Sequence, residues 1–465
     1  MNIPGFMELF NEGKLTEAFE CIIRDNPFPS SSGRICHFHC KMRCRREDID
    51  YPVSQGEIHR YIADQIYKVG KDKKIIEGLA KERFPKTGKK ISIIGAGPCG
   101  LTAAFYLARL GHDVVMYEAN SEPGGILRYG IPEYRLPKAV LRKEIAFIQS
   151  MGVKILCNKR FSGQDLDKKI KDSDAVFLAT GAYKSMKLGI PGEDLRGVLS
   201  GTAFLGDVAV GKDPLIGKKI VIIGAGNVAV DAARTALRFN SEVTIVYRRE
   251  KADMPANKEE IKGAESEGVK FIFLANPKAI LGDSHGLLQG LIATRMTLGE
   301  YDSSGRRKPV ATDEVFEIPC DTVILAIGEK VDAEFIKGCG ILINQDGTVK
   351  ADRFDLKTSL DKVYAGGDLV MGPATAVEAM SDGKKAARII DRTLSAEDRF
   401  AKLFRKFVYK SSVPLEPRAS KKLDAEKLEI NKRRNNFKEV SLGLSLKQAQ
   451  AQAQRCLRCD VKEGK

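Results

Sequence analysis

Cysteines gather at two places in this chain. Within the stretch SGRICHFHCKMRC they recur every four residues, at Cys36, Cys40 and Cys44, and near the other end Cys456 and Cys459 form a C-x-x-C pair. Such short spacings let thiolates converge on an iron–sulfur cluster or on zinc. A disulfide and a site without metal are the other two interpretations of these residues.

Each interpretation needs a different set of ligands. Zinc would use Cys36 and Cys40 with His37 or His39, since it accepts mixtures of cysteine and histidine. An iron–sulfur cluster would take Cys36, Cys40 and Cys44 with one further ligand. Disulfides are disfavoured in a reducing compartment. The other cysteines are scattered and are interpreted as structural: Cys21, Cys99, Cys157, Cys320 and Cys339.

Composition places the chain among soluble globular proteins of several domains. It has 465 residues, of which 43% are hydrophobic and 29% charged. The start has no signal-peptide pattern, and no apolar run approaches the roughly 20 residues of a membrane span. We therefore expect a cytoplasmic protein without a membrane span.

The net charge of +15 raises the question of an acidic partner. The basic residues are spread over many segments, with local excess at 402–410 and 416–434, and aromatic residues are not interleaved with them. Nucleic-acid binding is therefore not expected. Anionic cofactors or an acidic partner protein explain the charge better.

The segment KKISIIGAGPCGLTAAFYLARLGHDVVMYEAN (89–120) predicts a strand, a tight turn, a helix and a second strand. Gly95, Gly97 and Gly100 form the G-x-G-x-x-G pattern, in which the backbone approaches a pyrophosphate at the helix N-terminus. The second strand ends in Glu118, where a carboxylate would bind ribose hydroxyls. This pattern predicts an FAD site.

A second unit of the same kind follows at 218–250. Gly224 and Gly226 match the first two glycines and Ala229 the third, but here the second strand ends in Arg248 and Arg249. A carboxylate would repel a 2′-phosphate, whereas guanidinium groups bind it. The unit therefore predicts NADPH in preference to NADH. The predicted NADP(H) residues are Gly224, Gly226, Asn227, Val228, Arg248, Arg249 and Gly328.

Three further pieces fit a flavin domain with a nicotinamide domain inserted into it. The loop SEPGGILRYGIPEYRLP (121–137) could run close to a flavin, and AVFLATGA and TVILAIGE read as buried strands at the crossovers. In KVYAGGDLVMGPATAVEAM, Asp368 could bind a ribityl hydroxyl, while a helix opening near Thr375 aims N–H groups at the flavin. The predicted FAD residues are Gly95, Gly97, Gly100, Glu118, Gly125, Leu127, Gly181, Gly367, Asp368, Thr375 and Ala376.

These motifs carry a resemblance over nearly the whole chain. GAGPCGLTAA, GGILRYGIPEYRLPK, GAGNVAVDAAR, YRREKADMPA and AGGDLVMGPATAVEAM make it similar to the small (beta) subunit of NADPH-dependent glutamate synthase. They make it equally similar to the FAD subunit of electron-bifurcating NADH-dependent ferredoxin:NADP oxidoreductase. The resemblance implies an N-terminal helical domain that binds two [4Fe–4S] clusters.

The cluster ligands depart from the pattern that the resemblance implies. Ser32 stands in place of the first cysteine of the N-terminal segment, and the RCLRC pair lies at the C-terminus without the cysteines that normally follow it. His59 occupies a position where relatives use Gln or Glu as a ligand. We predict a [4Fe–4S] or [2Fe–2S] cluster whose candidate ligands are Cys36, Cys40, Cys44, His59, Cys456 and Cys459. An ordinary hydrogen-bonded role for His59 stays open.

The C-terminal pair would be returned to the N-terminal segment by a helix. The stretch SLKQAQAQAQR is rich in Ala and Gln, and Ser445 is a suitable N-cap for it.

The predicted fold is α/β. It has two Rossmann-like domains of the pyridine nucleotide-disulfide oxidoreductase type, for FAD and NADPH, and an N-terminal α-helical iron–sulfur domain. The FAD domain is expected in two segments on either side of the insertion. The predicted division is a helical iron–sulfur domain (1–85), the first FAD-domain segment (86–208), an inserted NADP(H) domain (209–335), the second FAD-domain segment (336–395) and a basic C-terminal tail with the CLRC motif (396–465).

The predicted function is that of an FAD-dependent NADP(H) oxidoreductase subunit. It would pass electrons between NADP(H), flavin and iron–sulfur clusters in a multi-subunit complex, of which an electron-bifurcating complex is one form. The partners would be ferredoxin- or NAD-linked flavin and iron–sulfur subunits. The first alternative is the small subunit of NADPH-dependent glutamate synthase, paired with its large subunit. The second is a non-catalytic assembly subunit, which the intact glycine motifs oppose.

Overall fold

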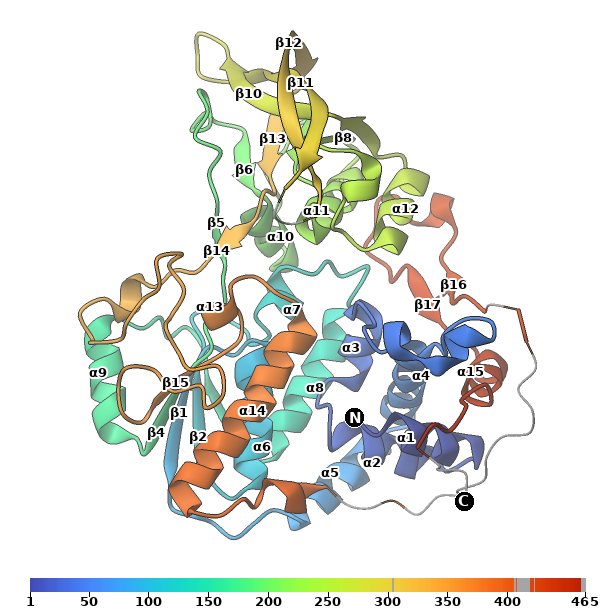
Figure 1. The fold of residues 1–465 in the computed structure, drawn as a ribbon, viewed down its shortest axis with the longest axis vertical. Coiled ribbons are helices and arrows are strands. Elements are labelled where there is room, and N and C mark those ends of the chain that lie inside the picture. Colours follow the sequence, from blue (N-terminus) through green and yellow to red (C-terminus); the bar gives the residue numbers. More distant parts are fainter. Residues whose placement is uncertain (303–304, 405–406, 408–418, 422, 461–465) are drawn as a thin grey trace.

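The computed structural model describes all residues except 303–304, 405–406, 408–418, 422 and 461–465. The helices of the N-terminal unit lie beside the helices that cover a first parallel sheet, and a second unit with its own parallel sheet stands above them (Figure 1). The N-terminal helices are α1 (Ile3–Asn11), α2 (Leu15–Ile23), α3 (Pro29–Ile35), α4 (Gln55–Lys68) and α5 (Asp72–Lys81).

The first sheet has five parallel strands in the order β15-β4-β1-β2-β3. Runs of β-branched residues form its central strands, as in KISII of β1, which pairs Ile91 with Val114 of β2. The strands are β1 (Lys90–Ile94), β2 (Asp113–Tyr117), β3 (Lys154–Leu156), β4 (Ala175–Leu178) and β15 (Val363–Ala365). The helices of this unit are α6 (Pro98–Arg109), α7 (Ile126–Tyr129), α8 (Lys138–Ser150), α9 (Gly163–Asp172), α13 (Asp368–Met371) and α14 (Ala376–Ser395).

The second unit repeats this plan with a parallel sheet in the order β6-β13-β7-β8-β9. Its strands are β6 (Val198–Ser200), β7 (Lys219–Ile223), β8 (Glu242–Tyr247), β9 (Lys270–Phe273) and β13 (Thr322–Leu325). Its helices are α10 (Gly201–Ala209), α11 (Asn227–Leu237) and α12 (Lys258–Glu267). An antiparallel sheet of β10 (Ala275–Gly282), β11 (Leu288–Tyr301) and β12 (Arg307–Pro319) packs beside it.

Two short antiparallel strands, β5 (Lys184–Ser185) and β14 (Glu329–Lys330), pair where the chain enters and leaves the second unit. Strand β6 pairs with β13, and Phe204 and Leu205 of α10 lie in the core of this unit. The second unit therefore begins well before the predicted boundary at residue 209, because a short edge strand without a glycine motif gives no signal in the sequence.

The C-terminal segment returns to the N-terminal helices. Its elements are β16 (Glu426–Lys427), β17 (Ser441–Gly443) and α15 (Leu446–Ala453), and α15 packs against α4 and α1. Ser445 caps α15 in a capping box with Gln448, as the sequence predicts. Ala449 and Ala453 lie in the same core as Phe6 and Leu101. The N-terminal unit, the first sheet and the C-terminal helix thus share one hydrophobic core.

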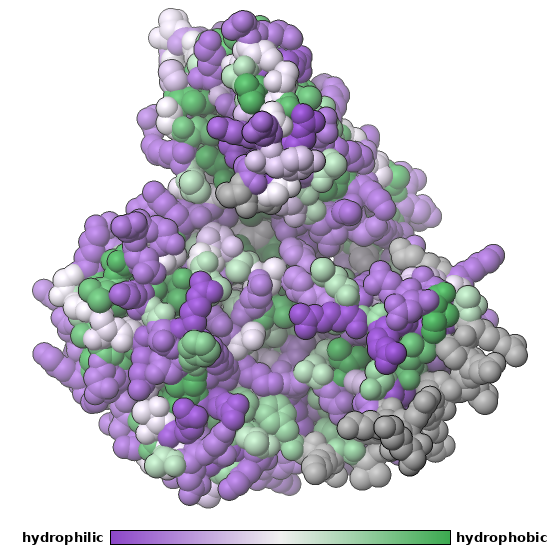
Figure 2. All heavy atoms as spheres, in the orientation of Figure 1, coloured by the Kyte–Doolittle hydropathy of each residue, from purple (hydrophilic) through white to green (hydrophobic). Residues whose placement is uncertain are grey.

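No helix in the described part of the chain is long and apolar enough to cross a membrane. The face shown in Figure 2 is largely hydrophilic, with hydrophobic side chains in small separate groups.

Candidate functional site

A cavity of about 1020 Å³ opens at the carboxyl ends of the strands of the first sheet. Ligands of open parallel sheets bind at this edge. Seven of the predicted FAD residues line the cavity: Gly95, Gly97, Glu118, Gly125, Gly181, Asp368 and Ala376.

The first glycine turn is shaped for close approach of a ligand. Gly95 has a φ of +104°, and a Cβ there would lie 2.4 Å from the carbonyl oxygen of Ala179. At Gly100 a Cβ would meet the Gly95 oxygen at 2.1 Å. Gly97 differs, because a Cβ there would meet no atom closer than the Gly125 Cα at 3.8 Å. Gly95 and Gly100 thus shape the turn, whereas the space in front of Gly97 is left for a ligand at the N-terminus of α6.

Glu118 lies buried at the end of β2 and lines the same cavity. Its Oε2 accepts a hydrogen bond from the Ala96 backbone N–H at 3.0 Å, and its Oε1 accepts one from the Asn120 backbone N–H at 2.9 Å. These bonds fix the carboxylate at the turn. Each oxygen can accept more than one bond, so the group remains able to bind ribose hydroxyls.

Two buried polar atoms of the cavity have no hydrogen-bond partner among the described residues: Asp368 Oδ1 and Thr180 Oγ1. Burial is the main reason why the pKa of Asp368 rises to about 7, with Glu378, Asp382 and Glu329 adding to it. Unpartnered buried polar groups are costly unless a ligand satisfies them. The residues therefore fit the hydroxyl-bearing chain of a flavin dinucleotide.

The other predicted FAD residues act around the cavity without lining it. Leu127 is buried in the core, and the Gly367 N–H donates to Asp382 Oδ2 at 2.9 Å. Thr375 caps α14 in a capping box with Glu378. Four further lining residues follow β3 and β4 and were not predicted: Lys159, Arg160, Phe161 and Thr180. Their position just after the carboxyl ends of parallel strands was the signal that could have identified them.

The second glycine turn repeats the geometry of the first. Gly224 has a φ of +129°, and a Cβ there would lie 2.1 Å from the Ala326 oxygen. Gly226 caps α11, and a Cβ there would meet nothing within 4 Å. Asn227 and Val228 open α11, and the Gly328 carbonyl accepts from the Met186 N–H at 3.0 Å. This turn fits the pyrophosphate of a second dinucleotide.

The two arginines at the end of β8 have different surroundings. Arg248 is exposed, whereas Arg249 is buried. Arg249 Nη2 lies 2.6 Å from Asp302 Oδ2, and its Nε donates to the Arg307 carbonyl at 2.9 Å. Arg249 is therefore bound to residues of the antiparallel sheet and the turn between its strands. Arg248 is the guanidinium that remains accessible to a 2′-phosphate.

The loop before α8 joins the two nucleotide units. Arg135 forms an ion pair with Asp231 of α11 at 2.5 Å, and the Tyr134 hydroxyl donates to the Asp231 carbonyl at 3.3 Å. Arg238 lies over the Tyr134 ring, 3.8 Å from its centroid. Lys138 Nζ donates to the carbonyl of Leu127 in α7 and to the carbonyls of Ile131 and Leu136 in this loop.

The candidate cluster cysteines are free thiols that lie in two places. Cys40 lies near Cys36, while Cys456 lies near Cys44 and Cys459; burial raises the pKa of Cys40 and of Cys456, and these neighbouring thiols raise it further. Thiolates are the donors that iron–sulfur clusters take. Within the described residues, however, no three His, Cys, Asp or Glu side chains gather as a group that could hold a metal ion. The donor chemistry fits a cluster, and the ligand set stays a prediction.

His59 is buried in α4, where its ring makes an edge contact with Phe6. Its Nδ1 lies 2.9 Å from the Pro29 carbonyl, which can only accept, so Nδ1 carries the proton. Burial lowers the pKa of His59 to about 4. The neutral ring therefore holds the start of α3, the helix that precedes Cys36. Ser32 is also buried in α3 and accepts from Asn26 Nδ2 at 2.8 Å.

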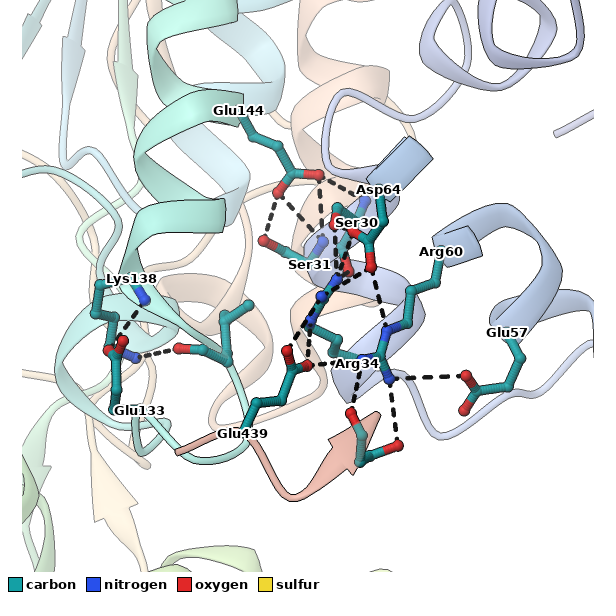
Figure 3. A network of polar contacts seen from close by, with 12 residues as sticks. Ser30, Ser31, Arg34, Glu57, Arg60, Asp64, Glu133, Lys138, Glu144 and Glu439 are labelled. Atoms are coloured by element: carbon teal, nitrogen blue, oxygen red, sulfur yellow. Dashed lines mark hydrogen bonds and ion pairs between the residues drawn. The ribbon is translucent and has the colours of Figure 1, made fainter. Parts of the chain in front are cut away.

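A polar network ties the cysteine-bearing segments together (Figure 3). Arg34 of α3 pairs with Asp64 of α4 and with Glu439 of the C-terminal segment, and Arg60 Nη2 also reaches Glu439 at 2.7 Å. Glu144 of α8 accepts from the backbone N–H groups of Ser30 and Ser31, at the N-terminus of α3. The C-terminal segment is thus held against the helices that flank the first cysteines.

Two parallel sheets, each with a glycine turn at a helix N-terminus, define an oxidoreductase with sites for FAD and a nicotinamide dinucleotide. The chain belongs to the pyridine nucleotide-disulphide oxidoreductase family, whose profile matches residues 89–383. Residues 1–71 match the profile of dihydropyrimidine dehydrogenase domain II, 4Fe-4S cluster. The protein is therefore an NADP(H)-dependent flavin oxidoreductase with FAD, NADP(H) and a [4Fe–4S] cluster as cofactors, which confirms the predicted fold class and enzyme class.

Curated relatives support the same assignment. The chain is 37% identical to the NADP(+)-dependent formate dehydrogenase subunit beta of Moorella thermoacetica, over 99% of this chain and 69% of the relative. It is 37% identical to the NADPH-Fe(3+) oxidoreductase subunit beta of Geobacter sulfurreducens, over 99% of this chain and 73% of the relative. It is 34% identical to the glutamate synthase [NADPH] small chain of Escherichia coli, over 83% of this chain and 84% of the relative. The predicted family resemblance is confirmed.

Solved structures share the fold at low identity. FprA of Mycobacterium tuberculosis in complex with NADPH aligns with a TM-score of 0.57 at 22% identity, over 69% of this chain and 87% of that one. Lactococcus lactis thioredoxin reductase aligns with a TM-score of 0.52 at 24% identity, over 66% of this chain and 100% of that one. These likenesses show a shared fold.

Proposed function

We propose that this chain is the NADP(H)-handling subunit of a larger electron-transfer complex. FAD supplies hydride exchange with the nicotinamide, and the iron–sulfur cluster supplies one-electron transfer. The observation that carries the proposal is that three features meet in one chain. They are the flavin cavity, a second glycine turn with Arg248 exposed beside it, and a cysteine segment whose His37 contacts the helix of that turn. The relatives named as beta or small subunits support it.

The residues of the two nucleotide sites would take distinct parts. The N-termini of α6 and α11, opened by Gly97 and Gly226, would receive the two pyrophosphates. Glu118 would bind the ribose of FAD, and Asp368 a ribityl hydroxyl. Arg248 would bind the 2′-phosphate that distinguishes NADPH from NADH.

For the cluster we propose Cys36, Cys40 and Cys44 as ligands, with Cys456 or Cys459 supplied by the C-terminal segment. The packing of α15 on α1 and α4 and the position of Cys456 near Cys44 support this assignment. His59 would support the cluster through its bond to Pro29, which holds α3 in front of Cys36. Thiolate ligands need reduced cysteines, so the proposal includes a cytoplasmic setting.

The complex would contain ferredoxin- or NAD-linked flavin and iron–sulfur subunits, and an electron-bifurcating assembly is one form of it. A glutamate synthase small subunit is the second candidate, favoured by the 34% identity to that chain over 83% of the present one. Purification of the native complex from its source with identification of the bound chains distinguishes them: a glutamate synthase large chain would replace the first form of the proposal by the second.

The cluster ligands are tested by iron and acid-labile sulfide analysis of anaerobically purified protein. We expect both in the wild type. Both should be lost in a variant with Ser at Cys36, Cys40 and Cys44, while FAD stays bound. A matched variant with Ser at Cys157 and Cys339 should keep its iron. Stoichiometric zinc without sulfide in the wild type would contradict the assignment.

A further inference from the structure

A histidine of the cysteine segment reaches the helix of the NADP(H) site. His37 directly follows Cys36 and is exposed, and its Nε2 lies 3.2 Å from Nδ2 of Asn227. Asn227 is the first residue of α11, directly after Gly226, where the second pyrophosphate would bind. The contact therefore joins the predicted cluster segment to the nucleotide turn.

The orientation of the Asn227 amide is fixed from its other side. The backbone N–H of Asn257 donates to Asn227 Oδ1 at 3.0 Å, so the oxygen of the amide faces Asn257 and the nitrogen faces His37. Since Nδ2 can only donate, His37 Nε2 accepts this bond. An amide nitrogen carries two protons, and the contact with His37 uses one of them. The second is available for a ligand at the open space in front of Gly226.

Two of the charged groups around His37 have partners of their own. Arg135, His39 and Glu378 are the charged or titratable groups close to it. Arg135 pairs with Asp231, and Glu378 completes the capping box of Thr375. Neither ion pair nor capping box involves His37, so the bond to Asn227 is the contact that relates this ring to the nucleotide site.

We propose that His37 is a positioning residue for NADP(H). It holds the Asn227 amide so that the second N–H donates to the pyrophosphate, and it thereby couples nucleotide binding to the cysteine segment. The proposal rests on the NADP(H) site proposed above. Because coupling between two sites is reciprocal, bound nucleotide stabilises the segment around Cys36 to the same extent that His37 favours the nucleotide.

Calorimetry on the anaerobically purified holoprotein tests this role with NADP⁺ and 2′-AMP as probes. We expect His37→Ala to weaken NADP⁺ binding about 3- to 10-fold, the effect of one neutral hydrogen bond. Binding of 2′-AMP, which has no pyrophosphate, should not change. His37→Gln should restore NADP⁺ binding, because its side-chain oxygen can accept the bond. His39→Ala, a neighbouring exposed histidine, should bind NADP⁺ like the wild type, and iron content should be equal in all variants.

Hydrogen exchange gives a second readout that a purely structural role would not move. NADP⁺ should slow exchange over residues 36–40 in the wild type and leave it unchanged in His37→Ala. If His37→Ala binds NADP⁺ as the wild type does, or if His39→Ala loses as much affinity, the role of His37 is overturned. A wild type that does not bind NADP⁺ at all would instead overturn the nucleotide site itself.

Discussion

Arg34 Nε lies 2.6 Å from Glu439 Oε1, and this ion pair joins the helix before the first cysteines to the segment that carries the last two. Arg60 shares the same carboxylate, at 2.7 Å. Both arginine side chains are almost fully buried, and Glu439 shares the compensation of their charges with Asp64. Together with the Arg455–Asp50 pair, the Arg34–Glu439 pair links the two ends of the chain in the described structure.

Glu439→Gln should therefore loosen the C-terminal segment. We expect the free energy of unfolding to fall by about 2 kcal/mol, as for loss of a hydrogen-bonded charge that faces buried arginines. Urea denaturation measures the loss, and iron analysis shows whether the displaced segment supplies a cluster ligand. Glu429→Gln is the matched control, since Glu429 pairs with Lys432 on the surface of the same segment. Equal stability of the two variants would contradict the role of Glu439.

Substitutions in the two glycine turns should each abolish the binding of a different nucleotide. A Cβ at Gly97 or at Gly226 has room in the protein, and both backbones have ordinary negative φ, so neither substitution should disturb folding. Gly97→Val should yield protein without the yellow colour of FAD, because the side chain fills the space of the pyrophosphate. Gly226→Val should keep FAD and lose NADP⁺ binding. Full FAD occupancy in Gly97→Val would show that the flavin is placed wrongly.

Substitutions of the two arginines at the end of β8 should have different effects, one on nucleotide affinity and the other on stability. Arg248→Ala should weaken NADPH by about 1.5–3 kcal/mol and leave NADH unchanged, because it removes a charge-assisted bond to the 2′-phosphate. Arg249→Ala should instead lower thermal stability, since it leaves the partly buried Asp302 without that guanidinium. Parallel titrations with the two nucleotides make the comparison. Equal losses for NADPH and NADH in Arg248→Ala would contradict the assignment.

The buried carboxyl group of Glu144 should make the stability of the protein depend on pH. Burial raises the pKa of this carboxyl to about 8, although the bonds from Ser30 and Ser31 lower it to some extent. Between about pH 4.5 and 8 the folded protein therefore holds a proton that the unfolded chain releases, and stability falls as pH rises. Unfolding curves of the wild type and Glu144→Gln should diverge over this window, with the wild type losing stability relative to the variant. A constant difference from pH 5 to 8 would show that Glu144 does not titrate there.

The sequence predicted the regions of the fold whose physics is local. Glycines are required at Gly95 and Gly224, where a Cβ would collide with the backbone, and they leave a clear pattern in the sequence. The N-cap role of Ser445 is likewise predicted from the residues next to it. The buried state of Arg249 could not be predicted, because Asp302 comes from a distant hairpin. Nor could the contact between His37 and Asn227, which depends on how two units pack.

Electron transfer from NADPH through the flavin to the iron–sulfur cluster is tested most directly by anaerobic titration with NADPH. The titration is followed by absorption and by electron paramagnetic resonance. We predict that flavin absorbance bleaches and that the signal of a reduced iron–sulfur cluster then appears in the same protein, with both changes weakened in Arg248→Ala. Bleaching of the flavin without any cluster signal, in protein that contains iron and sulfide, would contradict it.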